Sequence, residues 1–226
     1  MPAGRCATAH VPRPDAPFAL HSAGGSDATP TSGFADIVPI SLVHTSESQL
    51  YASLRDYKSE SPYITDRVRA EHALLLAATL QRFLRIHRPH IEEAAGVAWG
   101  TIQVVPSTRP ERAEHPLEAV IRRTIFRDEL AQLLTRTGEP SGHNEPNPAA
   151  FAPVGDVQRR RVLIVDDTFT TGARVQSVAA ALMNAGATVV AAVPIGRVID
   201  TNRPEKEEFW RARRAIAFDF DTCCLE

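Results

Sequence analysis

The most constraining feature of the chain is an apolar run that leads directly into two aspartates. Residues 161–165 read Arg-Val-Leu-Ile-Val, the pattern of a strand that is buried on both faces of a parallel sheet. Asp166 and Asp167 follow at once, and we expect the strand to end there, before a threonine-rich turn and Gly172. Because ligands bind at the carboxyl ends of strands in open α/β sheets, this segment predicts a fold class and the position of a site.

Other segments supply the strands and helices that such a sheet needs. Pro39 marks the first strand as an edge strand or a strand start, and Pro89 is expected to end the longest helix. Residues 136–160 carry little periodicity and are expected to form a loop with room for one short strand. Strands are predicted over 37–43, 102–105 and 188–195, and helices from Ser46 or Ser48 to Tyr57 and over 65–87, 117–134, 172–186 and 205–214. The order predicts an α/β fold with a central, mainly parallel sheet flanked by helices.

Composition limits the classes of protein to which the chain can belong. With 226 residues and 43% hydrophobic residues, it can build one substantial α/β domain. A net charge of −2 argues against a field that attracts nucleic acid or an anionic membrane, which leaves a local basic patch as the alternative. No apolar run approaches the roughly 20 residues of a membrane span. The N-terminus lacks a charged region followed by an apolar one, so a signal peptide is not expected. A cytoplasmic protein is the expectation.

Both ends of the chain have little that suggests a packed core. Residues 1–33 are rich in Ala, Pro, Ser, Gly and Thr and are expected to be a disordered tail, followed by a folded region over 34–226. Cys6, Cys223 and Cys224 do not provide a disulfide framework for a chain of this length. We expect Cys223 and Cys224 to be packed or exposed without a special function, and a metal or redox role is the alternative.

The residues after the buried strand combine two kinds of ligand chemistry. Asp166 and Asp167 offer carboxylates that can bind hydroxyls or approach a metal ion. The following helix offers free N–H groups and a partial positive charge at its N-terminus, a suitable site for a phosphate. A phosphorylated sugar needs both. The alternative is structural: the aspartates cap the helix and the threonines form an ordinary turn.

This segment resembles the signature with which type I phosphoribosyltransferases bind phosphoribosyl pyrophosphate (PRPP): an apolar strand, two acidic residues and a T-T-G turn. The resemblance implies that Asp166 and Asp167 bracket the ribose hydroxyls, on which Mg²⁺ also sits, so that any contact of these carboxylates with the metal is indirect. It implies a 5-phosphate site made of Thr168, Thr170, Thr171, Gly172, Ala173 and Arg174. Arg174 replaces the threonine that usually ends the pattern, although arginine also pairs with phosphate.

A second match to the same family lies upstream of the first. Residues 104–112 follow a predicted strand, where the family has its pyrophosphate-binding loop, and the candidate donors are Ser107, Thr108, Arg109 and Arg112. Arg109 is also expected to be catalytic, together with Asp166 and Asp167. The alternative is a polar loop with solvated arginines. In the 136–160 loop, Arg136, His143 and Asn144 are weaker candidates for the leaving group, set against an ordinary surface role.

Within the superfamily, the chain is most similar to ComF-type and amidophosphoribosyltransferase-like proteins over residues 38–200. The features are the segment 49–58, the long helix after it and Gly196-Arg197. The four-cysteine zinc ribbon that often opens ComF-type proteins is missing. The resemblance implies a hood over 34–100, a PRPP-binding core over 101–200 and a C-terminal tail over 201–226. It also implies a homodimer.

The resemblance implies Mg²⁺-dependent transfer of a phosphoribosyl group to a nitrogen acceptor, with release of pyrophosphate. In purine enzymes of the family an acidic residue stands where this chain has Thr170, which argues against a hypoxanthine-guanine salvage enzyme. The alternative is a PRPP-binding regulator without catalysis, or an accessory protein of DNA uptake. His87, His90 and His115 are weighed as ligands against solvated or capping roles, which are favoured.

Overall fold

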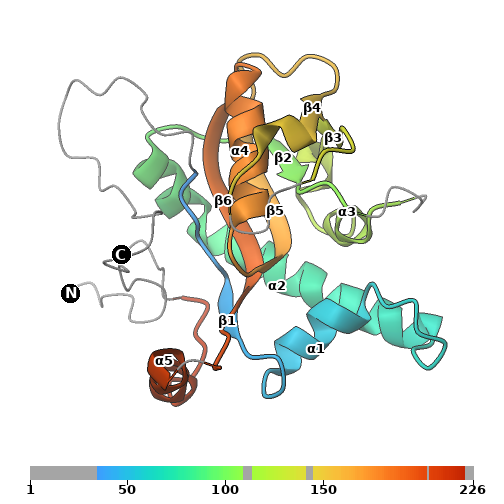
Figure 1. Ribbon diagram of the computed structural model, residues 1–226, viewed down its shortest axis with the longest axis vertical. Coiled ribbons are helices and arrows are strands. Elements are labelled where there is room, and N and C mark those ends of the chain that lie inside the picture. The colour runs from blue at the N-terminus through green and yellow to red at the C-terminus, as the bar shows by residue number, and fades with distance from the viewer. Residues whose placement is uncertain (1–34, 109–113, 141–144, 203, 222–226) are drawn as a thin grey trace.

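The computed structural model describes residues 35–108, 114–140, 145–202 and 204–221. Its centre is a parallel sheet of four strands in the order β1-β6-β5-β2 (Figure 1). The strands are β1 (Ser41–Val43), β2 (Thr101–Val104), β5 (Arg161–Phe169) and β6 (Thr188–Val198). The three main strands lie where the sequence predicts them, and β1 is the edge strand that Pro39 indicates.

Helices cover both faces of this sheet. One face packs on α1 (Gln49–Asp56), α2 (Asp66–Ala95) and α3 (Pro116–Ile121). The other face packs on α4 (Ala173–Asn184) and on a ribbon of two antiparallel strands, β3 (Leu134–Arg136) and β4 (Phe151–Pro153) (Figure 1). Alternate residues of β5 enter the two cores, since Leu163 and Val165 face one side and Val162 and Ile164 the other. The expected α/β architecture with a parallel sheet flanked by helices is confirmed.

The longest helix does not end at Pro89 as predicted. α2 continues through this proline to Ala95 and ends at Gly96, which adopts a left-handed conformation with φ 67°. A proline inside a helix removes the bond to the carbonyl four residues earlier, here that of Arg85. Both Arg85 and Pro89 lie on the exposed side of α2, so water can hydrate this carbonyl. The helix therefore tolerates the interruption.

The predicted helix over 117–134 is wrong beyond Ile121. α3 ends at Ile121, a short 3-10 helix follows at Arg127–Glu129, and Leu130 bridges to Ile102. The side chain of Gln103 on β2 explains the change. Its Oε1 accepts the backbone N–H groups of Leu133 at 2.6 Å and Leu134 at 3.2 Å. A buried amide thus draws this segment alongside β2, which outweighs its helical periodicity.

The region 136–160 contains more structure than the loop predicted for it. It holds the end of β3, a 3-10 helix at Pro148–Ala150 and β4, and this ribbon packs against α4 (Figure 1).

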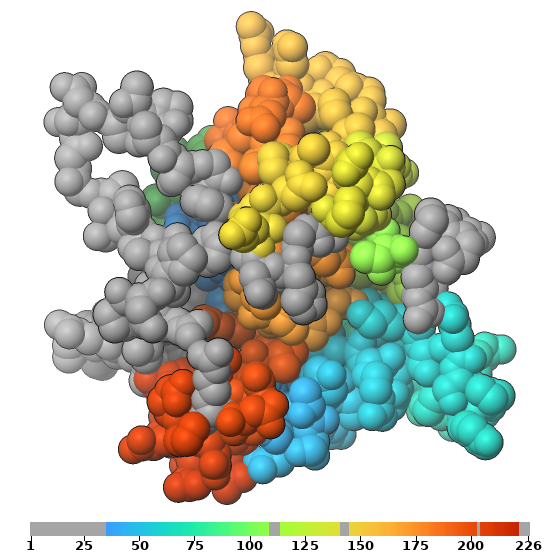
Figure 2. Space-filling model, viewed as in Figure 1, coloured from blue at the N-terminus to red at the C-terminus, as the bar shows by residue number. Residues whose placement is uncertain are grey.

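The C-terminal helix α5 (Pro204–Arg214) lies at the edge of the molecule, beside β1 (Figures 1 and 2). Trp210 attaches it: the indole Nε1 donates to Glu47 at 2.9 Å, and the ring stacks on His44. Within the described ranges, none of the helices combines the length and the apolar character needed to cross a bilayer. The predicted tail at 1–33 and all three cysteines lie outside the described residues.

Candidate functional site

The two aspartates lie at a step in the sheet. β2 ends at Val104, which pairs with Val165, whereas β5 runs on beside β6 as far as the pair Phe169–Arg197. The expectation that the strand ends at the aspartates is therefore wrong, because β6 continues to supply backbone partners. On its other side, β5 has no partner strand at Asp166 among the described residues, because β2 ends at Val104. This step leaves room for a pocket.

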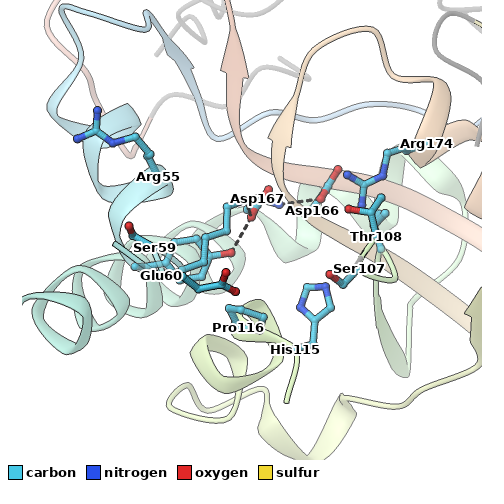
Figure 3. A pocket seen from close by; sticks show the side chains of 13 residues that line it. Arg55, Ser59, Glu60, Ser107, Thr108, His115, Pro116, Asp166, Asp167 and Arg174 are labelled. Atoms are coloured by element: carbon cyan, nitrogen blue, oxygen red, sulfur yellow. Dashed lines mark hydrogen bonds and ion pairs between the residues drawn. The ribbon is translucent and has the colours of Figure 1, made fainter. Parts of the chain in front are cut away.

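A pocket of about 380 Å³ occupies this step, a volume within the range of small-molecule sites. Figure 3 shows the aspartates at its centre, with Ser107, Thr108 and Arg174 on one side and Ser59 and Glu60 on the other. The structure therefore brings together two segments that the sequence nominates separately. The lining consists of Arg55, Tyr57, Lys58, Ser59, Glu60, Val105, Ser107, Thr108, His115, Pro116, Asp166, Asp167 and Arg174.

Both carboxylate oxygens of Asp167 are engaged. Oδ2 accepts the hydroxyl of Tyr57 at 2.6 Å and forms an ion pair with the ammonium of Lys58. Oδ1 accepts the hydroxyl of Thr168 at 2.6 Å. Burial alone raises the pKa of Asp167, but the charge of Lys58 and these hydrogen bonds outweigh it and hold the pKa below its ordinary value. Asp167 is therefore a stable carboxylate at neutral pH.

Asp166 is in the opposite situation. Its side chain is 7% exposed, and its Oδ1 accepts the backbone N–H of Asp167 at 3.0 Å. Burial, followed by the adjacent charge of Asp167, raises the pKa of Asp166 to about 7, although Arg174 and Lys58 act against this. Two neighbouring carboxylates thus carry different charges near neutrality. A cation or a hydroxyl donor that enters the pocket meets the ionised carboxylate of Asp167. A cation beside Asp166 also favours the ionisation of that second carboxyl group.

Arg174 links the two segments that carry the site. It lies in the first turn of α4, and its Nη2 donates to the carbonyl of Pro106 at 3.2 Å. Its Nε is buried and has no hydrogen-bond partner among the described residues. A buried N–H without an acceptor is costly, so an anion that reached this guanidinium would find a donor ready for it.

The turn between the aspartates and α4 has the expected form. Gly172 is the N-cap of α4 with φ 83°, a conformation that favours glycine. A Cβ at this position would also lie 2.6 Å from the ring of Phe169. The aspartates precede the helix by several residues, so the alternative in which they cap it is wrong. Because glycine has no side chain with which to cap the helix, the first N–H groups of α4 suit an anion.

The other predicted phosphate ligands that the structure describes are not part of the pocket lining. Thr170 and Thr171 are exposed, Gly172 and Ala173 are buried, and the hydroxyl of Thr168 is bound to Asp167. Arg136 lies on β3, where its Nη2 donates to the carbonyl of Glu139 at 3.0 Å. Burial and the charge of Arg174 lower the pKa of Arg136, so two cationic groups are neighbours here. Arg109, Arg112, His143 and Asn144 lie outside the described residues.

Sequence reasoning missed the wall that the end of α1 contributes. Tyr57 and Lys58 belong to a segment that was recognised only for its resemblance to ComF-type proteins, and no role was predicted for them. One signal was available, since Lys58 is one of only two lysines in the chain. Ser59 and Glu60 extend the same wall.

The three histidines separate into different roles. His115 lines the pocket and also caps α3, because its Nδ1 accepts the N–H of Leu117 at 3.2 Å. Burial lowers its pKa, although the charge of Asp167 acts in the other direction. His87 and His90 are on α2, away from the pocket lining, and Nε2 of His87 contacts the carbonyl oxygen of Phe220 at 2.6 Å. The favoured capping role is confirmed for His115.

The donor set bears on the expected magnesium ion. Among the described residues, no group of three or more His, Cys, Asp and Glu side chains could hold a metal ion. Magnesium in phosphate-transfer sites is usually bound through one or two carboxylates, the substrate phosphates and water. Asp166 and Asp167 can supply the carboxylates of such a site, to which the ion comes together with the ligand.

Comparisons of the chain with protein-family models, with curated proteins and with solved structures found no match.

Proposed function

We propose that the chain is a type I phosphoribosyltransferase-like protein that binds PRPP with Mg²⁺ and transfers the phosphoribosyl group to a nitrogen acceptor. One observation carries the proposal. The aspartate pair and the segment Ser107–Thr108 come from distant parts of the sequence, and both line one pocket at the carboxyl end of a parallel sheet. Carboxylates for the sugar hydroxyls and donors for the phosphates then line one pocket of a size that suits a small ligand.

Each part of the donor has a suitable partner in the pocket or beside it. Asp166 and Asp167 are assigned to the ribose hydroxyls, and the N-terminus of α4 with Arg174 to the 5-phosphate. Ser107 and Thr108 are assigned to the diphosphate, and Arg109 and Arg112 belong to the same proposed loop. Arg174 supports this assignment because its buried Nε has no hydrogen-bond partner in the part of the chain that the structure describes. Its Nη2 also donates to the carbonyl of Pro106, beside the diphosphate loop.

The proposed reaction breaks the bond between the anomeric carbon and the diphosphate oxygen, whose electron pair leaves with pyrophosphate. The lone pair of the acceptor nitrogen forms the new C–N bond, and a proton from that nitrogen passes to solvent. Bound Mg²⁺ supplies neutralisation of the diphosphate charge. The carboxylates of Asp166 and Asp167 orient the ribose and favour the positive charge that develops on its ring. Cationic side chains of the diphosphate loop stabilise the leaving group.

Calorimetric titration of PRPP in the presence of Mg²⁺ tests the donor site. We expect micromolar binding to the wild type and at least a hundredfold loss in an Asp166→Asn, Asp167→Asn double variant, because two carboxylate contacts disappear. The matched control is Asp128→Asn, whose side chain is 89% exposed and lies outside the pocket lining. If the wild type gives no heat and no thermal stabilisation, the proposal fails.

A second function has specific support and uses the same ligand. The protein would bind PRPP as a regulator, or as a ComF-like accessory of DNA uptake, without catalysis. Thr170 is exposed where purine enzymes of the family carry an acidic group. In the region where the family has its closing loop, β3 and β4 pair as a ribbon that packs on α4. Pyrophosphate release distinguishes the two. An enzyme releases pyrophosphate from PRPP with ammonia or another amine, whereas a regulator binds PRPP and releases none.

A further inference from the structure

The carboxylate of Asp167 is already bound by the protein itself. Lys58 forms an ion pair with Oδ2, Tyr57 donates to the same oxygen, and Thr168 donates to Oδ1. The proposed function assigns this carboxylate to the sugar and its accompanying cation. A ligand that uses Asp167 must therefore replace at least one of these contacts, and Lys58 is the cationic one.

The position of Lys58 is fixed by the packing of α1 on the sheet. A Cβ on Gly196 would lie 2.6 Å from Cδ1 of Leu54 and 3.1 Å from Val43, so the glycine allows α1 to lie directly against β6. Gly196 pairs in register with Thr168, the residue after Asp167. The residue that follows α1, Tyr57, is 6% exposed. Lys58 thus reaches Asp167 from an anchored helix end, and the ion pair is a built feature of the pocket.

The surroundings determine what can replace Lys58. Its side chain is 35% exposed and that of Asp167 is 14% exposed, so the pair is only partly hydrated. A free divalent cation that took over Asp167 would break the ion pair between Lys58 and this carboxylate in a partly buried pocket, which is unfavourable. A ligand that carries phosphate groups removes this penalty, because its oxygens offer the ammonium a new counter-ion.

We propose that Lys58 is a specificity-determining residue that makes the pocket accept a divalent cation only together with a phosphate-bearing ligand. Lys58 releases Asp167 to the ligand's cation and hydroxyls, and then pairs with the phosphate oxygens of the same ligand. The chemical class selected is a metal–diphosphate or metal–phosphosugar complex. A free metal ion can bind Asp167 but offers no counter-ion to Lys58. A free anion can pair with Lys58 but offers no cation to Asp167. This inference rests on the proposed function for the identity of the natural ligand.

Binding of Mn²⁺ with and without inorganic pyrophosphate tests the inference. The readout is the paramagnetic resonance of free Mn²⁺, corrected by a titration without protein for the Mn²⁺ that pyrophosphate itself binds. In the wild type, pyrophosphate is expected to tighten Mn²⁺ binding by about tenfold or more, a typical coupling between two ligands. In Lys58→Met, Mn²⁺ alone is expected to bind about tenfold more tightly than in the wild type, and the effect of pyrophosphate falls towards one. Lys58→Arg keeps the cation and is the matched control, expected to retain the coupling.

Two further variants separate this role from a structural one. Tyr57→Phe removes a hydrogen bond from Asp167 and leaves the ammonium, so it is expected to keep the coupling between Mn²⁺ and pyrophosphate. Lys58→Gln repeats the test with a polar side chain in case the methionine variant is unstable, and thermal melting verifies the fold of each variant. A structural ion pair predicts lower melting temperatures and no gain in affinity for Mn²⁺ alone.

Three results would decide the matter. The inference is overturned if wild-type protein binds Mn²⁺ equally well with and without pyrophosphate, or if neither Lys58→Met nor Lys58→Gln gains affinity for Mn²⁺. It is supported if the gain and the loss of coupling occur together. Failure of the wild type to bind PRPP would instead overturn the proposed function. The measurements with Mn²⁺ and pyrophosphate would then still decide the role of Lys58.

Discussion

Two clusters of charged side chains in this protein are built in contrasting ways. In the Arg88 cluster, each guanidinium nitrogen has an acceptor: Nε donates to Glu92 at 2.8 Å, Nη1 to Glu129 at 2.8 Å and Nη2 to the carbonyl of Trp99 at 2.9 Å. The indole of Trp99 donates to the other oxygen of Glu129 at 2.7 Å. The guanidinium also lies over the indole ring, 4.4 Å from its centroid.

In the Asp166–Asp167 cluster the groups are not balanced in this way. Asp166 is buried with a raised pKa, and the Nε of Arg174 is buried without a partner among the described residues. A pocket opens between them. A charge cluster that only holds a fold together tends to satisfy its own members, whereas a ligand site keeps groups that are satisfied on binding. The difference separates a structural cluster from a candidate site without reference to any relative.

Removing the centre of the Arg88 cluster is expected to have the largest effect on stability. Arg88→Met leaves Oε1 of Glu129 and the carbonyl of Trp99 without a donor, and we expect a loss of about 2 kcal/mol in the free energy of unfolding. Urea denaturation measures it. The exposed Arg85→Met is the matched control on the same helix and should change stability by less than about 0.5 kcal/mol. Affinity for PRPP should not change, and a change would mean that the two clusters are coupled.

Gly196→Ala is expected to disturb the candidate site through α1 rather than through its charges. The new methyl group meets Leu54 and Val43, which should cost about 1–2 kcal/mol of stability. The end of α1 should shift and weaken the contact between Lys58 and Asp167. Gly100→Ala is the control, because a Cβ there meets no atom within 4 Å. Unaltered Mn²⁺ binding in Gly196→Ala would show that α1 does not position Lys58.

Asp166→Asn is expected to act on stability with the opposite sign to Arg88→Met. The folded-state pKa of about 7 lies above the ordinary value of 3.8, so the folded protein binds the proton more tightly than the unfolded chain. The stabilisation by this proton is complete at pH values below about 4 and is lost as the pH rises to about 7. Removal of the charge should therefore raise stability at pH 8 by about 1 kcal/mol, although PRPP binding is lost.

Urea denaturation of Asp166→Asn and the wild type between pH 5 and pH 8 measures this effect. Wild-type stability should decline over that window by more than the stability of the variant, and the difference isolates Asp166 from the histidines. Asp128→Asn is again the control, and it should follow the wild type at every pH. Parallel profiles for Asp166→Asn and the wild type would mean that Asp166 is already ionised at pH 5.

The smallest effect is expected for a charge pair that belongs to neither cluster. Arg211 and Glu207 form an exposed pair, four residues apart on α5, at 2.7 Å. Arg211→Gln should change the free energy of unfolding by about 0.3 kcal/mol, because solvent screens such pairs. Thermal or urea denaturation in low and high salt measures the change. A larger effect would show that an exposed pair such as Arg211–Glu207 stabilises the fold through its geometry alone, without burial.

The parallel core could be predicted because strands buried on both faces leave a continuous apolar signal. The runs that became β2, β5 and β6 therefore lie close to their predicted positions. The segment 117–134 could not be assigned in the same way, since the side chain of Gln103 decides its path and the sequence gives no distance between the two. The continuation of α2 through Pro89 depends on the exposure of one helix side, which is also a tertiary property.

The residues of the candidate site also divide into those that a local motif reveals and those that only the tertiary fold brings to the site. Asp166, Asp167 and Gly172 were recognisable because their chemistry lies in one contiguous motif, and Ser107 and Thr108 because they follow a strand. Tyr57 and Lys58 reach Asp167 only because α1 packs against Gly196. The rarity of lysine draws attention to Lys58, but nothing local in the segment 49–58 indicates its partner. Residues that complete a site from a distant element need the fold to be known.

The buried amide of Gln103 has a further consequence, which concerns the outer edge of the sheet. β2 is an edge strand, and an uncovered edge is a template on which another chain can add a strand. Here the N–H of Ala131 donates to the carbonyl of Ile102 at 3.0 Å, and Gln103 holds Leu133 and Leu134 alongside. The opposite edge, β1, is only three residues long. The sheet is thus protected at both sides against edge-to-edge aggregation, and Gln103→Leu should increase the tendency of the protein to form fibrils.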